Sequence, residues 1–250
     1  AFDLTALLRA DDDYKDYTDN FDTEASLGRY QDVEMTFTYG TRNPSTLGRS
    51  PSVVYDSLTG SNVLQLQGSM LELKDCFLPE KGRMTTVTFD TWLDASSTTY
   101  PFQWTPLQFY ISYIDADNWT AVRYYGSGTK VLGNIDVYTV KDGTAKGLYN
   151  QKSMNPAFDP WQPISVELSY IGDSGDCLIK IIQGDIKVEQ TVNIGSVRGR
   201  FAMGSTSPDL KQMYDNVVVK MTKGDWDEDI VAETSTVYYS GNTYVSPGDV

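Results

Sequence analysis

Acidic side chains are the residues of this chain best suited to chemistry, because the sequence has 34 Asp and Glu residues and no histidine. Histidine is the side chain that most often acts as a general base near neutral pH. Its absence excludes a Ser-His-Asp triad, a Cys-His pair and every His-ligated zinc or iron site. Any catalysis would have to use carboxylates, tyrosine, lysine or a bound ion, so we expect a non-catalytic binding or building module.

A second group of candidate residues is aromatic and polar. Sugars stack on aromatic rings and form hydrogen bonds with polar side chains beside them. Two neighbouring segments with strand-like alternation each carry such side chains on one side. The predicted ligand-binding residues are Gln108, Tyr110, Trp119, Arg123 and Tyr125. The alternative interpretation is that these large aromatic side chains only fill the core, where such residues are mostly buried.

The elements that must position these residues are strands. From about residue 30 the chain alternates apolar and polar residues, with Gly, Asp and Asn at the turns and no long amphipathic helix. About a dozen strands at hairpin spacing predict an antiparallel sandwich or barrel. The predicted strands are 33–38, 53–56, 62–67, 83–93, 106–114, 118–125, 130–140, 163–171, 176–183, 185–193, 200–204 and 213–221.

Charge divides the chain into a nearly neutral middle and two acidic ends. Residues 1–35 carry ten acidic and three basic side chains, and residues 224–250 carry six acidic and none that is basic. Nucleic acids and anionic membranes attract clusters of Lys and Arg, so this pattern argues against both as partners. We expect an acidic arm at 1–20, one sandwich domain at 21–223 and a second acidic arm at 224–250.

Two further features limit the class of protein. No apolar run approaches the length of about 18 residues that a membrane span needs, so no membrane insertion is expected. Cys76 and Cys177 are the only cysteines, and two isolated cysteines do not make a disulfide framework. A single disulfide and two buried thiols both stay open, and the thiols are favoured.

Four stretches and the opening segment resemble the concanavalin A-like lectin/glucanase superfamily, especially its laminin-G-like branch. They are the strand ending in TWL at 91–93, the hairpin FYISYIDADNWTAVRYY, the run WQPISVELSYIGDSGDCLIKIIQGDIKVEQ, the closing pair GRFAMGS and MYDNVVVK, and the opening TDNFDTEASLGRYQ. The resemblance covers most of the chain. It implies an all-β, antiparallel two-sheet jelly-roll sandwich.

The resemblance also implies a calcium site and suggests where to look for catalytic carboxylates. Relatives hold calcium between the opening segment and the last strand, which here places Asp22 beside Asp215, with backbone carbonyls completing the shell. Glucanases of this fold carry paired carboxylates on one strand. Neither Asp22-Thr23-Glu24 nor the pair Asp90 and Asp94 forms that motif fully.

We therefore expect a non-catalytic, extracellular, cell-surface or virion-surface module that binds glycan and is stabilised by calcium. Two alternatives stay open. The first is a structural assembly subunit, such as a virion decoration, tail or filament protein, that binds neighbouring subunits through its arms as a homo-oligomer. The second is a carboxylate-based enzyme that acts on carbohydrate.

Overall fold

Alternating burial defines most of the strands. β12 (Asp176–Gln183) reads DCLIKIIQ, and every second residue from Cys177 onward is buried. A strand with this pattern presents one face to a core and the other toward solvent. The computed structural model describes residues 17–33, 49–74, 83–94, 107–125, 132–158, 161–171, 175–193, 199–205 and 211–223.

The first of two antiparallel sheets has eight strands in the order β13-β12-β11-β6-β15-β4-β3, with β1 also paired to β15. Besides β12, its strands are β1 (Tyr17–Asp19), β3 (Arg49–Asp56), β4 (Ser61–Gln67), β6 (Arg83–Leu93), β11 (Ile164–Ile171), β13 (Ile186–Asn193) and β15 (Gln212–Lys223).

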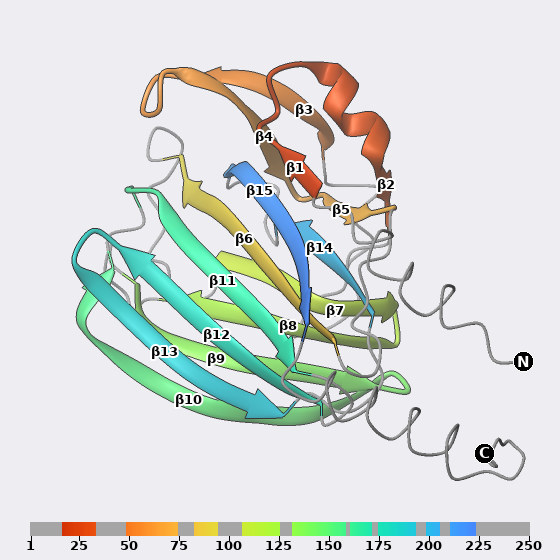
Figure 1. Ribbon diagram of the computed structural model, residues 1–250, viewed down its shortest axis with the longest axis vertical. Coiled ribbons are helices and arrows are strands. Elements are labelled where there is room, and N and C mark those ends of the chain that lie inside the picture. The colour runs from red at the N-terminus through yellow and green to blue at the C-terminus, as the bar shows by residue number, and fades with distance from the viewer. Residues whose placement is uncertain are drawn as a thin grey trace, which may run out of the picture.

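The second sheet has seven strands in the order β10-β9-β8-β7-β14-β5-β2. Figure 1 shows the two sheets as two layers, with the 3-10 helix η2 (Glu24–Arg29) at one end. The strands of this sheet are β2 (Tyr30–Asp32), β5 (Met70–Leu73), β7 (Leu107–Asp115), β8 (Asn118–Tyr125), β9 (Leu132–Lys141), β10 (Thr144–Phe158) and β14 (Arg200–Gly204).

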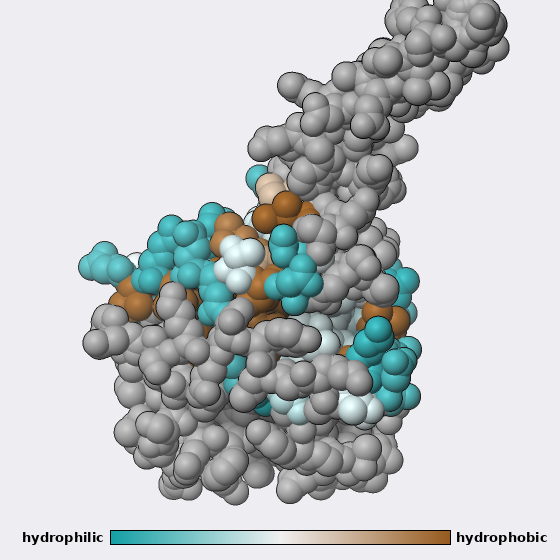
Figure 2. All heavy atoms as spheres, turned by 90° about the horizontal axis from the view of Figure 1, so that it is seen from below, coloured by the Kyte–Doolittle hydropathy of each residue, from teal (hydrophilic) through white to brown (hydrophobic). Residues whose placement is uncertain are grey.

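The main hydrophobic core lies between the two sheets. Phe89 of β6 contacts Phe109 of β7 edge-to-face at 4.9 Å between ring centroids, and lies 5.1 Å from Phe201 of β14. Burial of apolar surface in such a core is the dominant favourable contribution to folding. Where the described residues are visible from below, hydrophobic residues lie among hydrophilic ones (Figure 2).

The seven-stranded sheet is covered on its outer face as well. Successive side chains of a strand point to opposite faces, so Phe109 and Ile111 face the core between the sheets while Tyr110 faces away from it. This outer face carries a second buried cluster, which comprises Met70, Tyr110, Tyr113, Trp119, Ala121, Tyr138 and Ala202. Both faces of this sheet therefore contribute to stability.

The all-β antiparallel sandwich expected from the sequence is confirmed. Sequence alternation missed η2, the short strands β1, β2 and β5, and the edge strand β10. Of the strand predicted at 33–38, the structure describes only Val33, which is not in a strand.

The predicted boundary of the N-terminal arm at residue 20 needs correction. β1 lies within that range, and Tyr17, Thr18 and Asp19 pair with β15, so the sandwich begins no later than Tyr17. Residues 1–16 and 224–250, which make up the rest of the predicted arms, lie outside the described residues. Within the described ranges, no helix is long and apolar enough to cross a membrane.

The two cysteines can be placed only in part. Cys177 is buried in the core between the sheets. Cys76 lies outside the described residues, so the choice between a disulfide and two thiols stays a prediction.

Candidate functional site

The last strand changes partners halfway along its length. β15 pairs with β4 at Gln212–Tyr214 and with β1 at Val217–Val219. Between these two pairings, its register with β6 shifts between Asp215 and Val218, as in a β-bulge. Bulges redirect side chains at sheet irregularities. We call this place the β15 junction, and define it by Asp22, Asp90, Asp215 and Asn216.

Two carboxylates face each other at the β15 junction. Asp215 is the direct cross-strand partner of Asp90, and like charges directly opposite on neighbouring strands are destabilising. The Asp90 carboxylate is well satisfied, because it accepts hydrogen bonds from Ser165 Oγ at 2.6 Å and Asn216 Nδ2 at 2.9 Å. Asp215 Oδ1 accepts the Asn216 backbone N–H at 2.8 Å.

Asp22 reaches the junction from the other end of the chain. Its backbone carbonyl accepts a hydrogen bond from Asn62 Nδ2 at 2.8 Å, and its carboxylate accepts one from Asn20 Nδ2 at 2.8 Å. Its negative charge contributes to the raised pKa of Asp215. The charge of Asp22 therefore acts on the Asp215 carboxyl group, and the joint role of the two residues in holding a metal ion stays a prediction.

The loop that carries Asp22 is held at its start by β1 and η2. Asp19 Oδ1 accepts the Phe21 backbone N–H at 3.0 Å, and the Arg29 guanidinium donates to the Thr18 carbonyl at 2.9 Å. The Phe21 side chain is fully buried and stacks on Tyr30 with 5.7 Å between the ring centroids. These contacts fix the direction in which the chain leaves β1 and enters the junction.

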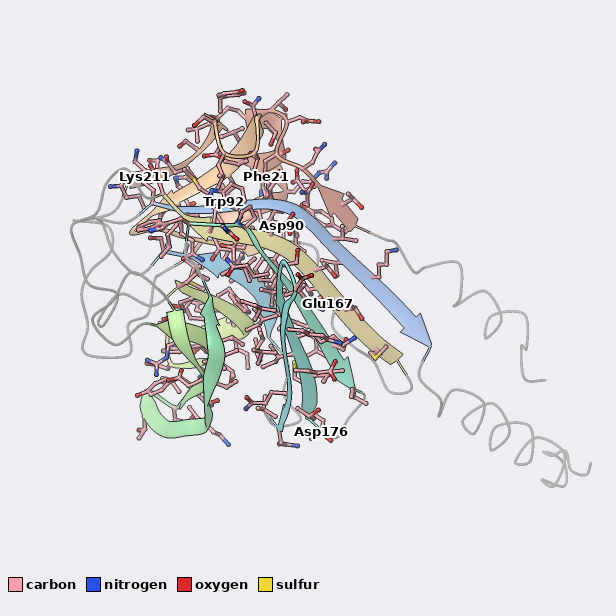
Figure 3. The ribbon with its side chains drawn as sticks, turned by 90° about the vertical axis from the view of Figure 1, so that its left-hand side faces the viewer. Phe21, Asp90, Trp92, Glu167, Asp176 and Lys211 are labelled. Atoms are coloured by element: carbon pink, nitrogen blue, oxygen red, sulfur yellow. The ribbon has the colours of Figure 1, made fainter. Side chains whose placement is uncertain are left out.

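Left-handed backbone occurs on both sides of the junction. Phe21 has φ of 50° and Asn216 has φ of 51°. Positive φ is uncommon for residues other than glycine, and it persists only where the surrounding structure enforces it. Figure 3 shows Phe21 and Asp90 toward one end of the molecule and Asp176 toward the other. The strained backbone therefore lies where the carboxylates meet.

The pKa of Asp215 is raised from its ordinary value of 3.8 to about 6, chiefly by burial and in smaller part by the nearby charges of Asp90 and Asp22. Only 6% of Asp215 is exposed. Burial without an opposite charge disfavours the ionised form of a carboxyl group. At neutral pH the junction therefore holds negative charge that would be stabilised by a cation.

The chemistry of the junction suits calcium, although its carboxylates alone are too few. Its side chains offer carboxylate and amide oxygens, which are the ligands that calcium prefers. Among the residues that the structure describes, no three Asp, Glu, Cys or His side chains are grouped to hold a metal ion. A calcium ion here would need backbone carbonyls and water in addition to Asp22 and Asp215.

Four of the five predicted ligand-binding residues, which are Gln108, Tyr110, Trp119 and Arg123, lie on the outer face of the seven-stranded sheet. Gln108 pairs with Arg123, and Tyr110 pairs with Ala121, two residues beyond Trp119 on β8. All four predicted residues whose side chains are described are buried, with Arg123 the most exposed at 5%. The side chain of Tyr125 lies outside the described residues. None of the four presents an open face on which a sugar could stack, and their role in binding stays a prediction.

Arg123 is committed to a partner within the protein. Its Nε and Nη2 atoms donate to the two carboxylate oxygens of Asp136 at 2.7 and 2.8 Å. Its guanidinium also lies 4.6 Å from the centroid of the Tyr138 ring. A bidentate pair of this kind is strong and geometrically specific. Arg123 therefore organises the outer face of the sheet.

Asp94, which was considered for catalysis, and the buried Glu72 both have structural partners. Asp94 forms an ion pair with Lys211 at 3.5 Å. Glu72 is paired with Arg200 at 3.1 Å and accepts a hydrogen bond from Gln31. These contacts give the carboxylates a structural role, and none of them arranges two carboxylates about a shared substrate position.

Sequence reasoning did not identify Tyr55. This residue is 70% exposed, and it is the one aromatic side chain among the large hydrophobic residues exposed in the described part of the chain. It lies in the run Val53-Val54-Tyr55, whose valines are half-buried. Residue type alone could not separate the exposed ring from its buried neighbours.

No protein-family model matches the chain, and no curated protein matches it in sequence. Solved structures do match it in fold. Arcelin-5, a lectin-like defense protein from Phaseolus vulgaris, is 12% identical, with a TM-score of 0.53 over 84% of this chain and 99% of arcelin. Lectin I from Ulex europaeus, in complex with the methyl glycoside of α-L-fucose, is 13% identical, with a TM-score of 0.52 over 84% and 98%.

A third similar structure comes from a bacteriophage. The CBM2 module of the evolved Dit protein of Lactobacillus casei BL23 phage J-1 is 8% identical, with a TM-score of 0.53 over 82% of this chain and 96% of the module. These matches confirm the antiparallel two-sheet sandwich fold that the resemblance implied.

Proposed function

We propose that this chain is a non-catalytic glycan-binding β-sandwich module that acts outside the cell or on the surface of a particle. The observation that carries the proposal is the two-sheet sandwich, which extends over more than four-fifths of the chain in each of the three similar structures described above. Lectins and a carbohydrate-binding module share this architecture. Because one fold can host many functions, the proposal needs a direct binding test.

A glycan array probed with the whole chain tests this proposal. We expect binding to a defined subset of neutral oligosaccharides, without cleavage of the bound sugar. Silence across a broad array would contradict glycan binding and would favour an assembly subunit. Release of shorter sugars during incubation would instead support the carbohydrate-active enzyme.

We further propose that calcium binds at the β15 junction and stabilises the fold. Asp22 and Asp215 would hold the ion, whose charge would offset the repulsion between Asp215 and Asp90. Thermal melting in excess calcium and in EDTA tests this. A ligand at 100 times its Kd stabilises by about 2.7 kcal/mol, which raises the Tm of a domain of this size by about 5–10 °C.

The calcium experiment has an internal control. Asp215→Asn should remove most of the calcium-dependent rise in Tm, whereas Asp176→Asn, at the other end of the sheet (Figure 3), should retain it. An identical melting temperature for the unsubstituted chain in calcium and in EDTA would contradict the proposed calcium site.

A role in particle assembly is the second candidate function. The specific observation that favours it is the similarity to a module of a phage Dit protein, with a TM-score of 0.53. Removal of residues 1–16 or 224–250 tests assembly through the arms without disturbing β1. Loss of an oligomer would support assembly, and an unchanged oligomeric state would contradict it.

A further inference from the structure

The hairpin between β3 and β4 is a rigid projection at the end of the eight-stranded sheet. Its turn is closed by the Gly60 N–H, which donates to the Asp56 carbonyl at 2.9 Å. Asp56 Oδ2 accepts the backbone N–H groups of Leu58 and Thr59, each at 3.0 Å. Gly60 has φ of 76°, which a residue without a Cβ adopts readily. Residues next to this turn are therefore held in place.

Tyr55 stands on this hairpin with most of its ring in solvent. It pairs directly with Asn62 of β4, so the two side chains lie on the same face of the hairpin, with Cβ atoms about 5 Å apart. Asn62 is also exposed, and its Nδ2 atom donates to the Asp22 carbonyl. An open aromatic ring thus has a fixed amide beside it.

The segment that leads into η2 borders the same face. Glu24 Oε1 accepts the backbone N–H of Val53, two residues before Tyr55, at 3.1 Å. Asn20, Asp22 and Glu24 are all exposed. The face of the hairpin that carries Tyr55 is therefore bordered by amide and carboxylate groups from two separate segments of the chain.

We propose that Tyr55 is the stacking surface for a neutral sugar ring, with Asn62 and the 20–24 segment supplying hydrogen bonds. This inference rests on the proposed glycan-binding function and names the part of the molecule that carries it. An aromatic face with polar groups at its margin is the arrangement that sugar binding requires. The carboxylates of Asp22, Glu24 and Asp56 repel uronic acids, which sets the specificity for uncharged sugars.

Calorimetric titration of the whole chain tests the inference. The probes are neutral gluco-, manno- and galacto-oligosaccharides, together with an oligogalacturonate as the acidic comparison. We expect at least one neutral probe to bind and the oligogalacturonate to bind more weakly. For the best neutral probe, Tyr55→Ala should weaken binding by about tenfold or more, because it removes the stacking surface.

Matched variants separate stacking from general effects. Tyr55→Phe and Tyr55→Trp keep an aromatic face and should retain affinity within about threefold. Ile114→Ala removes an exposed side chain of the other sheet and should leave affinity unchanged. Because Tyr55 is exposed, all three Tyr55 variants should fold, which circular dichroism checks.

Each outcome bears on the inference separately from the proposed function. An affinity of Tyr55→Ala equal to that of the unsubstituted chain would overturn the subsite while glycan binding stood. Preference for the oligogalacturonate would overturn the specificity for neutral sugars. Failure of all four probes to bind would overturn the subsite, and the glycan array then decides whether the module binds any sugar.

Discussion

Two regions of the molecule differ in how their charged side chains are paired and in how deeply their aromatic rings are buried. On the outer face of the seven-stranded sheet, Arg123 and Asp136 form a bidentate pair and Trp119 is 3% exposed. At the β15 junction and the neighbouring hairpin, carboxylates face each other and Tyr55 is open. In the first region the charged and aromatic groups stabilise the fold. In the second region the carboxylates and the Tyr55 ring remain available to a ligand.

Trp119→Ala should have the largest effect on stability, because its ring packs against Tyr110 at 5.4 Å and Tyr138 at 5.9 Å between centroids. Replacing a buried Trp by Ala costs about 3–5 kcal/mol through lost packing and the cavity left behind. Chemical denaturation with urea measures this loss. A loss below about 1 kcal/mol would show that the outer face is open in solution. It would restore that face as a candidate surface for sugar binding.

Arg123→Met should also lower the free energy of unfolding, by about 3–5 kcal/mol, because it leaves the Asp136 carboxylate buried without its partner. The double variant Arg123→Met with Asp136→Leu should recover most of that loss, since no unpaired charge remains. The two urea midpoints provide the comparison. If the single and double variants lose the same free energy of unfolding, the loss does not come from an unpaired Asp136 carboxylate. That result would contradict the structural role assigned to the Arg123–Asp136 pair.

Asp215→Asn should stabilise the chain in calcium-free buffer at pH 7, by at most about 3 kcal/mol. The pKa of Asp215 is about 6 in the folded protein and ordinarily 3.8, so the unfolded chain loses its proton first as the pH rises. The contribution of Asp215 to stability is therefore present below about pH 4 and is lost as the pH rises through 6.

Urea denaturation between pH 4 and pH 7 checks the sign of this prediction. The unsubstituted chain should lose stability relative to Asp215→Asn across that window. If the difference between the two proteins does not change with pH, Asp215 does not carry the uncompensated charge.

Tyr55→Ala should change stability the least, by less than about 0.5 kcal/mol, because exposed side chains away from special backbone contribute little. The quantity to compare is the free energy of unfolding lost in Tyr55→Ala and in Trp119→Ala. A loss of 2 kcal/mol or more, on the scale expected for buried side chains, would show that the Tyr55 ring packs within the fold and is not available to a ligand.

Much of the fold could be predicted from the sequence where one face of a strand is polar. The segment predicted at 163–171 is β11 (Ile164–Ile171), since its alternation follows the burial of one face. β10 (Thr144–Phe158) lacks such alternation and contains Gly147 and Pro156, and it lies at a sheet edge, where proline is tolerated. β5 was missed because all four of its residues are buried.

The candidate site was predictable only in part. The pairing of Asp22 with Asp215 was expected from the resemblance, and the charge of Asp22 does act on Asp215, while their role as metal ligands stays a prediction. The opposition of Asp90 and Asp215 depends on strand register, which no local pattern reveals. The exposure of Tyr55 and the burial of Trp119 depend on how each strand is covered in the folded molecule, which residue type does not determine.

The most direct test of the account is an NMR titration of the whole chain, labelled with ¹⁵N, with the best neutral oligosaccharide. The account predicts that the largest shifts of backbone amide signals fall on residues 53–62 and 20–24, which surround Tyr55. Shifts concentrated instead on β7, β8 and β9 would contradict it and would place the sugar on the outer face of the seven-stranded sheet.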